Sequence, residues 1–207
     1  VYKRQLLGKS LDAQTDFGEL HLVGQYDYEA LPQSIMRTLE HYLPSLIQAK
    51  SQYPLSYGKA NYAFTLRLND TKLLNSLLKT PITSSHAMRL TGIVRERQHE
   101  LDLNVNAPDV TYKGQQIKKL QLNINSEPQG LVTTISAERK GEQGPHILIN
   151  AQGLIADNTI SSDISFRLPG LSAIYGNVNS IASFSRRHGD LETHLHLNPS
   201  EINFDSI

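Results

Sequence analysis

The sequence contains no cysteine and no tryptophan, and aromatic residues make up only 7% of its 207 residues. Without cysteine, the chain has neither a disulfide framework nor a thiolate metal site. Lysine plus arginine equals aspartate plus glutamate at 20 each, so the formal net charge is zero. A nucleic-acid surface needs a basic excess to displace counterions from phosphates. We therefore expect no nucleic acid among the partners of this chain.

Long apolar runs are also missing. No stretch approaches the roughly 20 apolar residues that a helix needs to cross a bilayer, and no signal peptide is present. The chain starts at Val1 and ends at Ile207, each within a segment that reads as a strand. We therefore expect a piece of a longer protein, with any targeting signal or membrane anchor outside it. As one compact unit, a chain of this length could bury a sizeable core.

Alternation of apolar and polar residues is the dominant pattern that remains. In segment 101–106, leucine and valine alternate with aspartate and asparagine, and segment 120–125 repeats this with glutamine and asparagine. A side-chain period of two is what a half-buried strand requires. The same pattern occurs in the segments 20–28, 62–69, 131–137, 147–155, 160–168, 174–184 and 191–197.

Turn signals separate these segments. Glycine, proline, asparagine and aspartate gather at 112–114, 127–130, 140–142, 156–158 and 188–190. Such residues favour tight turns between strands. Strand and turn recur about every ten to fifteen residues, which indicates an antiparallel meander, a sandwich, a barrel or an elongated solenoid, and not βαβ units.

Two short stretches have helical periodicity instead. From Leu31 to Leu46, apolar residues recur every three or four positions, with Pro32 in the first turn and Pro44 at the end. From Asp70 to Leu78, Asp70 is a plausible N-cap ahead of a stripe of leucines. We therefore expect two amphipathic helices that cap or plug one end of the β-structure.

These patterns predict one β-rich unit covering residues 1–207. Strands occupy 1–28, a helical insertion with one strand occupies 29–80, and a β-groove occupies 81–207. The apolar face is rich in leucine, isoleucine, valine and alanine, interrupted by small residues such as Gly176 and Ser180. A closed sandwich usually fills its centre with larger rings. A lining of small and medium aliphatic residues fits an open groove as well as an ordinary core.

The eight histidines raise the question of a metal site. His194 and His196 are two residues apart in an expected strand, so both point to one side and could ligate one metal. The sequence suggests no third ligand. We therefore interpret the pair as solvent-facing strand positions and predict no metal and no cofactor.

Catalytic patterns are weak. Ser84, Ser85 and His86 place hydroxyl groups beside an imidazole, but a triad is an arrangement in space and not in sequence. No G-x-S-x-G elbow and no phosphate-binding glycine loop is present. A glycosidase pair could be drawn from four aspartates, although solubility explains most of them: Asp102, Asp109, Asp157 and Asp163. We predict no catalytic residues and no enzyme activity.

Several segments carry a family resemblance. The stretch from Leu101 to Gly114 reads as an alternating strand into Ala-Pro and then a Tyr-x-Gly turn, and a second alternating strand follows. Related short motifs occur at 15–28, 153–164, 176–185 and 198–204. Together these segments resemble the C-terminal region of TamB-like proteins of the Bacteroidota, within the AsmA-like envelope lipid-transport family. The resemblance covers most of the chain, although each motif is short.

The resemblance implies a fold and a setting. TamB-like proteins are anchored in the inner membrane, reach across the periplasm and meet a TamA-type barrel in the outer membrane. Their C-terminal parts form an elongated, U-shaped antiparallel β-sheet, the β-taco, with an aliphatic interior. The family is implicated in carrying phospholipid to the outer membrane and in assembling outer-membrane proteins. By this resemblance, the chain would lie in the periplasm and contact phospholipid acyl chains.

Two hypotheses follow, with a hydrolase as a third. The first is a lipid-carrying groove lined by one-face strand positions: Leu101, Leu103, Val105, Leu120, Leu122, Ile124, Ile135, Ile147, Ile149, Ile164, Phe166, Val178 and Leu195. The second is a β-sandwich that binds protein or carbohydrate partners through loops or edge strands. The hydrolase requires a convergent polar pocket. An accessible apolar face supports the first hypothesis, and a closed core supports the second.

Overall fold

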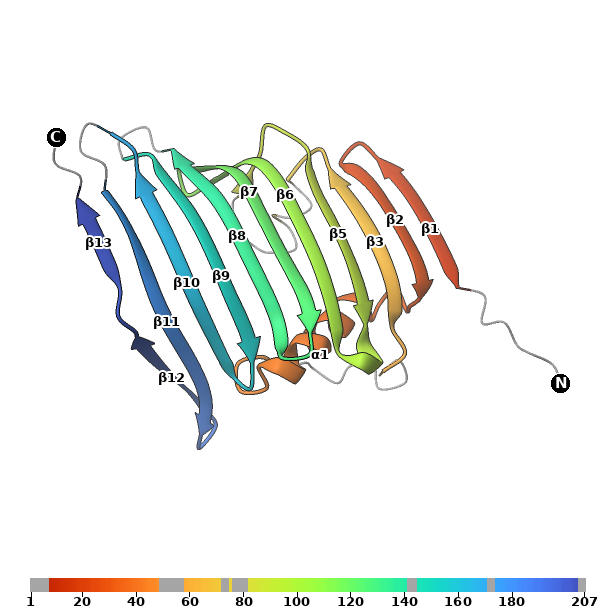
Figure 1. The fold of residues 1–207 in the computed structure, drawn as a ribbon. Coiled ribbons are helices and arrows are strands. Elements are labelled where there is room, and N and C mark those ends of the chain that lie inside the picture. The colour runs from red at the N-terminus through yellow and green to blue at the C-terminus, as the bar shows by residue number, and fades with distance from the viewer. Residues whose placement is uncertain are drawn as a thin grey trace.

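A single large antiparallel sheet organises the chain (Figure 1). The computed structural model describes residues 8–48, 58–71, 75, 82–140, 145–170 and 174–204. The strands in these ranges are β1 (Lys9–Thr15), β2 (Gly18–Gln25), β3 (Asn61–Leu68), β4 (Ile82–Thr83), β5 (Met88–Arg95), β6 (Glu100–Tyr112), β7 (Gln115–Glu127), β8 (Gly130–Lys140), β9 (Ile147–Ala156), β10 (Thr159–Leu168), β11 (Ile174–Arg187), β12 (Asp190–Leu197) and β13 (Glu201–Phe204). The prediction of a mainly β chain built on an elongated sheet is confirmed.

Strand order follows the chain closely. The sheet runs β1-β2-β3-β5-β6-β7-β8-β9-β10-β11-β12, with β4 added beside β6 and β13 added beside β11. All thirteen described strands belong to this one open sheet, so the described residues contain no second sheet packed against it. This is a meander and not the two-sheet sandwich of the second hypothesis.

The predicted turns lie where strands reverse. Lys113 and Gly114 join β6 to β7, and both have positive φ angles, of 48° and 76°. Asp157 and Asn158 join β9 to β10 in the same way, at 50° and 59°. Two successive residues with positive φ match the right-handed twist of a hairpin, which is why glycine, asparagine and aspartate occur there. The turn expected at 140–142 falls mostly outside the described residues.

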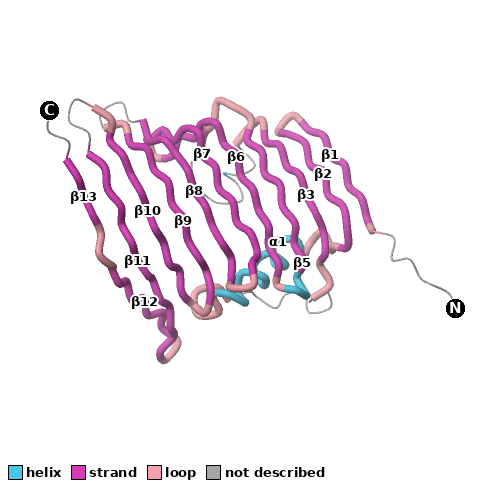
Figure 2. Tube along the Cα trace, viewed as in Figure 1, coloured by secondary structure: helices cyan, strands magenta, loops and turns pink. Residues whose placement is uncertain are grey.

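One helix, α1 (Leu31–Tyr42), crosses the ends of several strands (Figure 2). It begins with Pro32 in the first turn and ends two residues before Pro44, so the predicted extension to Leu46 is too long by one turn. Leu31, Ile35 and Leu39 pack on the sheet together with Tyr42. Most of the second predicted helix, from Asp70 to Leu78, lies outside the described residues, as do both chain ends. Among the described residues, no helix has the length and apolar character needed to span a membrane.

The core lies in the N-terminal half of the sheet. One cluster of buried residues lies under α1 and joins β2, β3, β5, β6 and β8: Leu22, Tyr26, Ala60, Tyr62, Val94, Leu101 and Leu131. A second cluster lies toward the opposite ends of the strands: Leu68, Met88, Ala107 and Val110. The two clusters bury opposite ends of the same apolar face.

Candidate functional site

The candidate lining residues share one face of the sheet. In an antiparallel pair, residues directly opposite each other point to the same side. Val105 lies opposite Leu122, which lies opposite Ile135. From Ile135 the row continues without a break through Ala151, Ile164 and Val178. We call this line of six residues across β6 to β11 the aliphatic row.

Neighbouring rows place the other candidates on the same face. Leu103 lies opposite Ile124, Leu120 opposite Ala107, and Leu101 opposite Val94. In the C-terminal half, Ile149 lies opposite Phe166, Ile147 opposite Arg139, and Leu195 opposite Ala182. We call this side of the sheet the apolar face.

Exposure separates these residues into three groups. Leu101 is only 2% exposed, because α1 covers it, and it belongs to the core and not to an accessible lining. Ile135 and Leu195 are exposed, at 39% and 65%. The remaining ten candidates are half-buried. The accessible part of the apolar face therefore begins beyond α1.

A β-bulge in β7 keeps the apolar face continuous. Lys119 has a φ of 51°, and the pairing of β7 with β8 shifts between Lys118 and Gln121. β7 has one extra residue here relative to β8, while its pairing with β6 keeps its register, and Ile117 and Leu120 lie opposite the buried Val110 and Ala107 of β6. The sequence gives no clear signal for this bulge, because strict alternation would place Ile117 and Leu120 on opposite faces.

Glycine and serine make parts of the apolar face flat. Gly176 lies opposite Phe166, and a Cβ atom at Gly176 would lie 2.8 Å from the Phe166 ring and 2.5 Å from the carbonyl oxygen of Glu201. The ring therefore covers the glycine backbone directly. Ser162 and Ser180 lie opposite each other, and their hydroxyl groups are hydrogen-bonded at 2.7 Å. Paired in this way, these hydroxyl groups already have partners.

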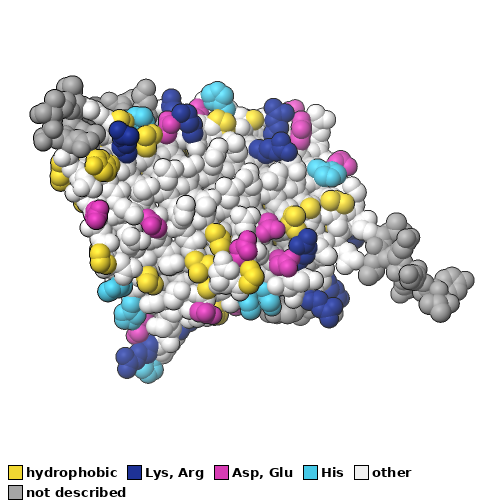
Figure 3. Space-filling model, viewed as in Figure 1, with side chains coloured by type: hydrophobic (Ala, Val, Ile, Leu, Met, Phe, Trp, Pro, Cys, Tyr) yellow, Lys and Arg dark blue, Asp and Glu magenta, His cyan; other side chains and the backbone are white. Residues whose placement is uncertain are grey.

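The opposite face of the sheet is mainly polar, although Val132, Leu154 and Ile181 also lie on it. The Asn104 side chain donates to Asn123, which in turn donates to the hydroxyl group of Thr134 at 3.1 Å. Gln152 and Asp163 continue this line across β9 and β10. The middle of the face shown in Figure 3 is mostly white, the colour of uncharged polar side chains and backbone. The apolar face, which carries many more aliphatic side chains, is therefore the better surface for an apolar ligand.

α1 is fastened at its middle and just beyond its end. In the middle of the helix, Arg37 donates to Glu96 in an ion pair whose side chains are 6% and 4% exposed, and Glu96 also accepts from the backbone N–H of Ala60 at 3.2 Å. Beyond its end, Asn158 donates from its backbone N–H to the carbonyl of Tyr42 at 2.9 Å. The Asn158 side chain accepts from the backbone N–H of Ser45 at 2.7 Å.

His41 of α1 stacks on His99. The rings of His41 and His99 lie 3.9 Å apart and nearly parallel, at 8°. The Tyr42 hydroxyl group donates to the carbonyl oxygen of His99 at 2.8 Å. Burial lowers the pKa of His99, and the neighbouring His41 lowers it further, while Glu96 opposes the shift. The pair therefore favours the neutral form of His99.

The serine, histidine and aspartate noted in the sequence do meet, but not as a triad. His86 Nδ1 lies 3.1 Å from the Ser85 hydroxyl group and 3.2 Å from Asp109 Oδ2. A catalytic triad uses opposite ring nitrogens for serine and aspartate. Hydrogen bonds from Ser85, first from its side chain and then from its backbone, lower the pKa of Asp109 to about 2. This arrangement ties segment 84–86 to β6.

The His-x-His pair lies on β12. His194 and His196 lie opposite Ser183 and Ile181 of β11, on the polar side of the sheet, and both are exposed. Across the described ranges, no group of three or more histidine, cysteine, aspartate or glutamate side chains is arranged to hold a metal ion.

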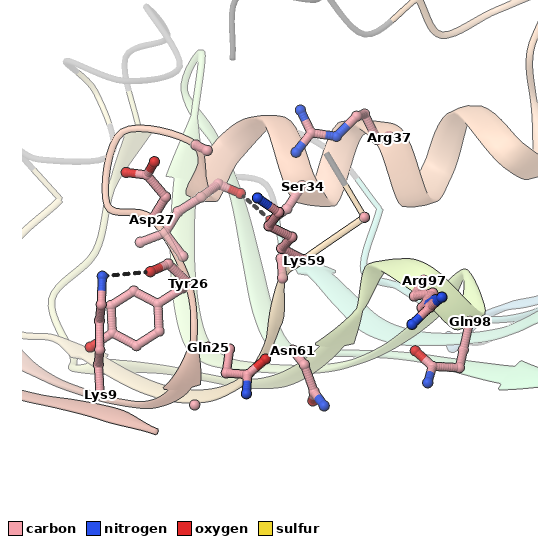
Figure 4. Close-up of a pocket in the computed structure, with 15 residues that line it drawn as sticks. Lys9, Gln25, Tyr26, Asp27, Ser34, Arg37, Lys59, Asn61, Arg97 and Gln98 are labelled. Carbon is pink, nitrogen blue, oxygen red and sulfur yellow. Dashed lines mark hydrogen bonds between the residues drawn. The ribbon is translucent and has the colours of Figure 1, made fainter. Parts of the chain in front are cut away.

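A cavity that the sequence does not predict lies at the start of α1. It measures about 640 Å³ and lies between the helix, the end of β2, the start of β3 and the turn after β5. Figure 4 shows Lys9 at one side of it and Arg97 at the other. The lining residues are far apart in sequence and form no motif, so only the fold brings them together.

No protein-family model matches this chain, and neither any curated protein nor any solved structure does.

Proposed function

We propose that this chain is a segment of an envelope protein whose apolar face holds phospholipid acyl chains on their way between the inner and outer membranes. The observation that carries this proposal is the aliphatic row, which crosses six strands and extends past the part of the sheet that α1 covers. In this proposal the chain is not an enzyme and binds no cofactor.

The length of the aliphatic row suits an acyl chain. Strands lie about 4.8 Å apart, so a row across six strands measures about 24 Å. An acyl chain fills about 15 Å of a bilayer, which is half of its hydrocarbon thickness. One chain lying across the strands would therefore contact aliphatic side chains along its whole length.

The energetic need for such a face is large. Exposing a free acyl chain to water costs about 0.8 kcal/mol per methylene group, or about 12 kcal/mol for sixteen carbons. Contact with isoleucine, valine and alanine removes much of this cost. Because the hydroxyl groups of Ser162 and Ser180 bond to each other, they offer a moving chain no strong polar attachment.

The setting of the proposal comes from the family resemblance. The chain would lie in the periplasm, with an inner-membrane anchor elsewhere in the protein and an outer-membrane TamA-type barrel as its partner. Two features of the fold support the proposal, the open edge of the sheet and the aliphatic row across β6 to β11. Exposed apolar side chains gather toward the C-terminal edge: Leu191, Leu195, Leu197, Ile202 and Phe204.

Photocrosslinking on two adjacent residues tests the proposal. Ile149 lies on the apolar face, and Asn150, the next residue of β9, lies on the polar face. A benzophenone amino acid is placed at each position in turn, and the chain is incubated with vesicles containing radiolabelled phosphatidylethanolamine. We expect lipid adducts from position 149 and few from position 150.

A matched pair of substitutions provides the second measurement. Ile149→Arg places a charge on the apolar face, whereas Asn150→Arg places the same charge in water. We expect Ile149→Arg to abolish transfer of a fluorescent phospholipid between vesicles and Asn150→Arg to leave it unchanged, with both variants folded by circular dichroism. Equal crosslinking at the two positions, or normal transfer by Ile149→Arg, would overturn the proposal and favour a protein- or carbohydrate-binding module.

A further inference from the structure

The cavity at the start of α1 has the size and shape of a small-molecule site. Its volume of about 640 Å³ falls in the range of about 300–1,000 Å³ that is typical of ligand pockets. Its walls come from five parts of the chain: β1, the segment around the end of β2, the first half of α1, the region from Gly58 to Asn61, and the turn after β5. The cavity lies over the N-terminal half of the sheet, away from the half-exposed strands of the apolar face.

The cavity is lined by more positively than negatively charged side chains. Lys9, Arg37, Lys59 and Arg97 line the cavity, and Asp27 is the one acidic residue among the described lining residues. The Arg37–Glu96 ion pair is largely neutral as a unit, so the positive potential comes from the two lysines and Arg97. This local excess contrasts with the zero formal charge of the whole chain.

Each side of the cavity contributes a cation in a different way. Lys9 is held in place, because its ammonium group donates to the Tyr26 carbonyl oxygen at 3.1 Å and lies 5.8 Å from the Tyr26 ring and 5.7 Å from the Tyr28 ring. Lys59 and Arg97 are exposed. One cation is thus fixed against the aromatic wall, and two exposed cationic side chains lie farther from that wall (Figure 4).

The start of α1 adds to the positive potential in the cavity. Ala30, Leu31 and Ser34 line the cavity, so the first turn of the twelve-residue helix borders it. The N-cap residue Ala30 provides no side-chain cap, and no acidic residue occupies the first turn. Backbone N–H groups at a helix N-terminus carry partial positive charge and favour anions. The helix and the cations therefore act in the same direction.

The remaining walls are apolar or neutral. Gly24, Leu31 and Ala60 supply aliphatic and backbone surface, and Gln25, Asn61 and Gln98 supply neutral amide groups. Such walls suit a ligand that joins an anionic group to a small organic body bearing hydroxyl groups. Phosphate esters have this composition, and guanidinium and ammonium groups bind phosphate oxygens through charge-assisted hydrogen bonds.

We infer that this cavity binds the phosphate group of a glycerophosphate-type phosphoester. The same chemistry occurs in two sources, a soluble phosphoester and the head group of a phospholipid. The inference does not depend on the apolar face, because the cavity and the aliphatic row share no residue.

Titration calorimetry with glycerol 3-phosphate tests the inference, and flotation with phosphatidylglycerol vesicles identifies the source. Glycerol 3-phosphate has no acyl chain, so its binding reports on the cavity alone. Binding of the soluble probe indicates a soluble phosphoester. Binding to vesicles without binding of the soluble probe indicates a lipid head group, provided that it depends on the cavity cations. Absence of both overturns the inference.

A charge-matched pair of double variants provides the control. Lys59→Gln with Arg97→Gln removes two cations from the cavity, and Lys113→Gln with Arg167→Gln removes two exposed cations from other parts of the surface. We expect the first variant to weaken binding about tenfold or more, because charge-assisted contacts are lost, and the second to leave it unchanged. All four side chains are exposed, so both variants should fold. Equal weakening by the two variants would show attraction to overall charge and would overturn the inference.

Discussion

The two halves of the sheet have the same alternation of apolar and polar side chains, but they differ in how far their apolar face is covered. In β1 to β8, the apolar face includes every hydrophobic strand residue that is buried among the described residues, from Leu22 to Leu131. Beyond Leu131, the larger hydrophobic side chains of the same face are half-buried or exposed, reaching 65% at Leu195 and 71% at Phe204. Both halves alternate equally well, so the alternation that orients a strand does not decide whether its apolar side is buried.

One helix accounts for part of the difference, because residues of α1 pack against the first buried cluster and not against the second. A helix of twelve residues is about 18 Å long, which is enough to cross about four strands. α1 therefore covers one row of side chains across the N-terminal half and reaches the turn between β9 and β10 at its end. In this fold, the elements that cover the sheet, and not the pattern of the strands, decide whether apolar residues form a core or a surface.

Loss of the buried ion pair should have the largest effect. Glu96→Gln leaves Arg37 charged inside the protein, and such a loss typically costs about 3–5 kcal/mol. The control is Glu100→Gln, because Glu100 pairs with Arg95 at 2.5 Å on side chains that are about 40% exposed, where a pair contributes about 1 kcal/mol or less. Urea unfolding measures both. Equal loss in the two variants would show that α1 is not fixed by the buried pair.

Truncation of one leucine in each half should separate core from surface. Leu101→Ala removes a residue that is 2% exposed and should destabilise the chain by about 2–4 kcal/mol. Leu195→Ala removes one that is 65% exposed and should cost less than about 1 kcal/mol. Denaturant midpoints give both values. A similar cost for the two substitutions would mean that the C-terminal half is covered in solution.

A glycine substitution tests whether the exposed half is nevertheless tightly packed. Gly176→Ala would place a Cβ atom 2.5 Å from the Glu201 carbonyl oxygen, and overpacking of this kind typically costs about 1–3 kcal/mol. Gly170→Ala is the control, because nothing lies within 4 Å of the position of its added Cβ atom. Thermal unfolding should show a lower midpoint for Gly176→Ala alone. An unchanged midpoint would indicate that β13 is not held against β11.

Acidification should loosen the covered half slightly. Because burial and His41 lower the pKa of His99, the unfolded chain binds a proton more readily than the folded chain below the ordinary histidine value of about 6.5. Stability should therefore fall as the pH decreases from 7 through 6.5 toward 5. His99→Gln should reduce this dependence, whereas His194→Gln, on exposed β12, should leave it unchanged. Urea midpoints at several pH values measure the effect.

Much of the sheet could be predicted from the sequence because its signals are local. A period of two predicts most of the strands, although it does not mark β4 or β5, and pairs such as Asp157–Asn158 mark the hairpins. Pro32 and Pro44 bracket α1. The thirteen candidate lining residues fall on one face for the same reason, since antiparallel pairing transmits orientation from strand to strand.

The rest depends on contacts between distant segments. The burial of Leu101 follows from the position of α1, which no local pattern specifies. The bulge at Lys119 breaks the alternation on which the prediction relied. The cavity combines Lys9, Lys59 and Arg97, three cations without a common motif. Each of these features arises from tertiary packing, so the sequence predicted the apolar face but not its accessible part.

The hydrogen bonds that hold the end of α1 have a consequence for the order of folding. From β5 to β12, each strand of the main sheet pairs with the one before it in that order, so hairpins can be added one after another with short loop closures. Asn158, however, binds the end of α1 from more than a hundred residues away, and the Arg186 side chain donates to the Ser45 carbonyl oxygen at 2.8 Å. The helix is synthesised early, yet its second attachment exists only after β9, β10 and β11 have formed. The attachment beyond the end of α1 is thus among the last contacts of the molecule that can form.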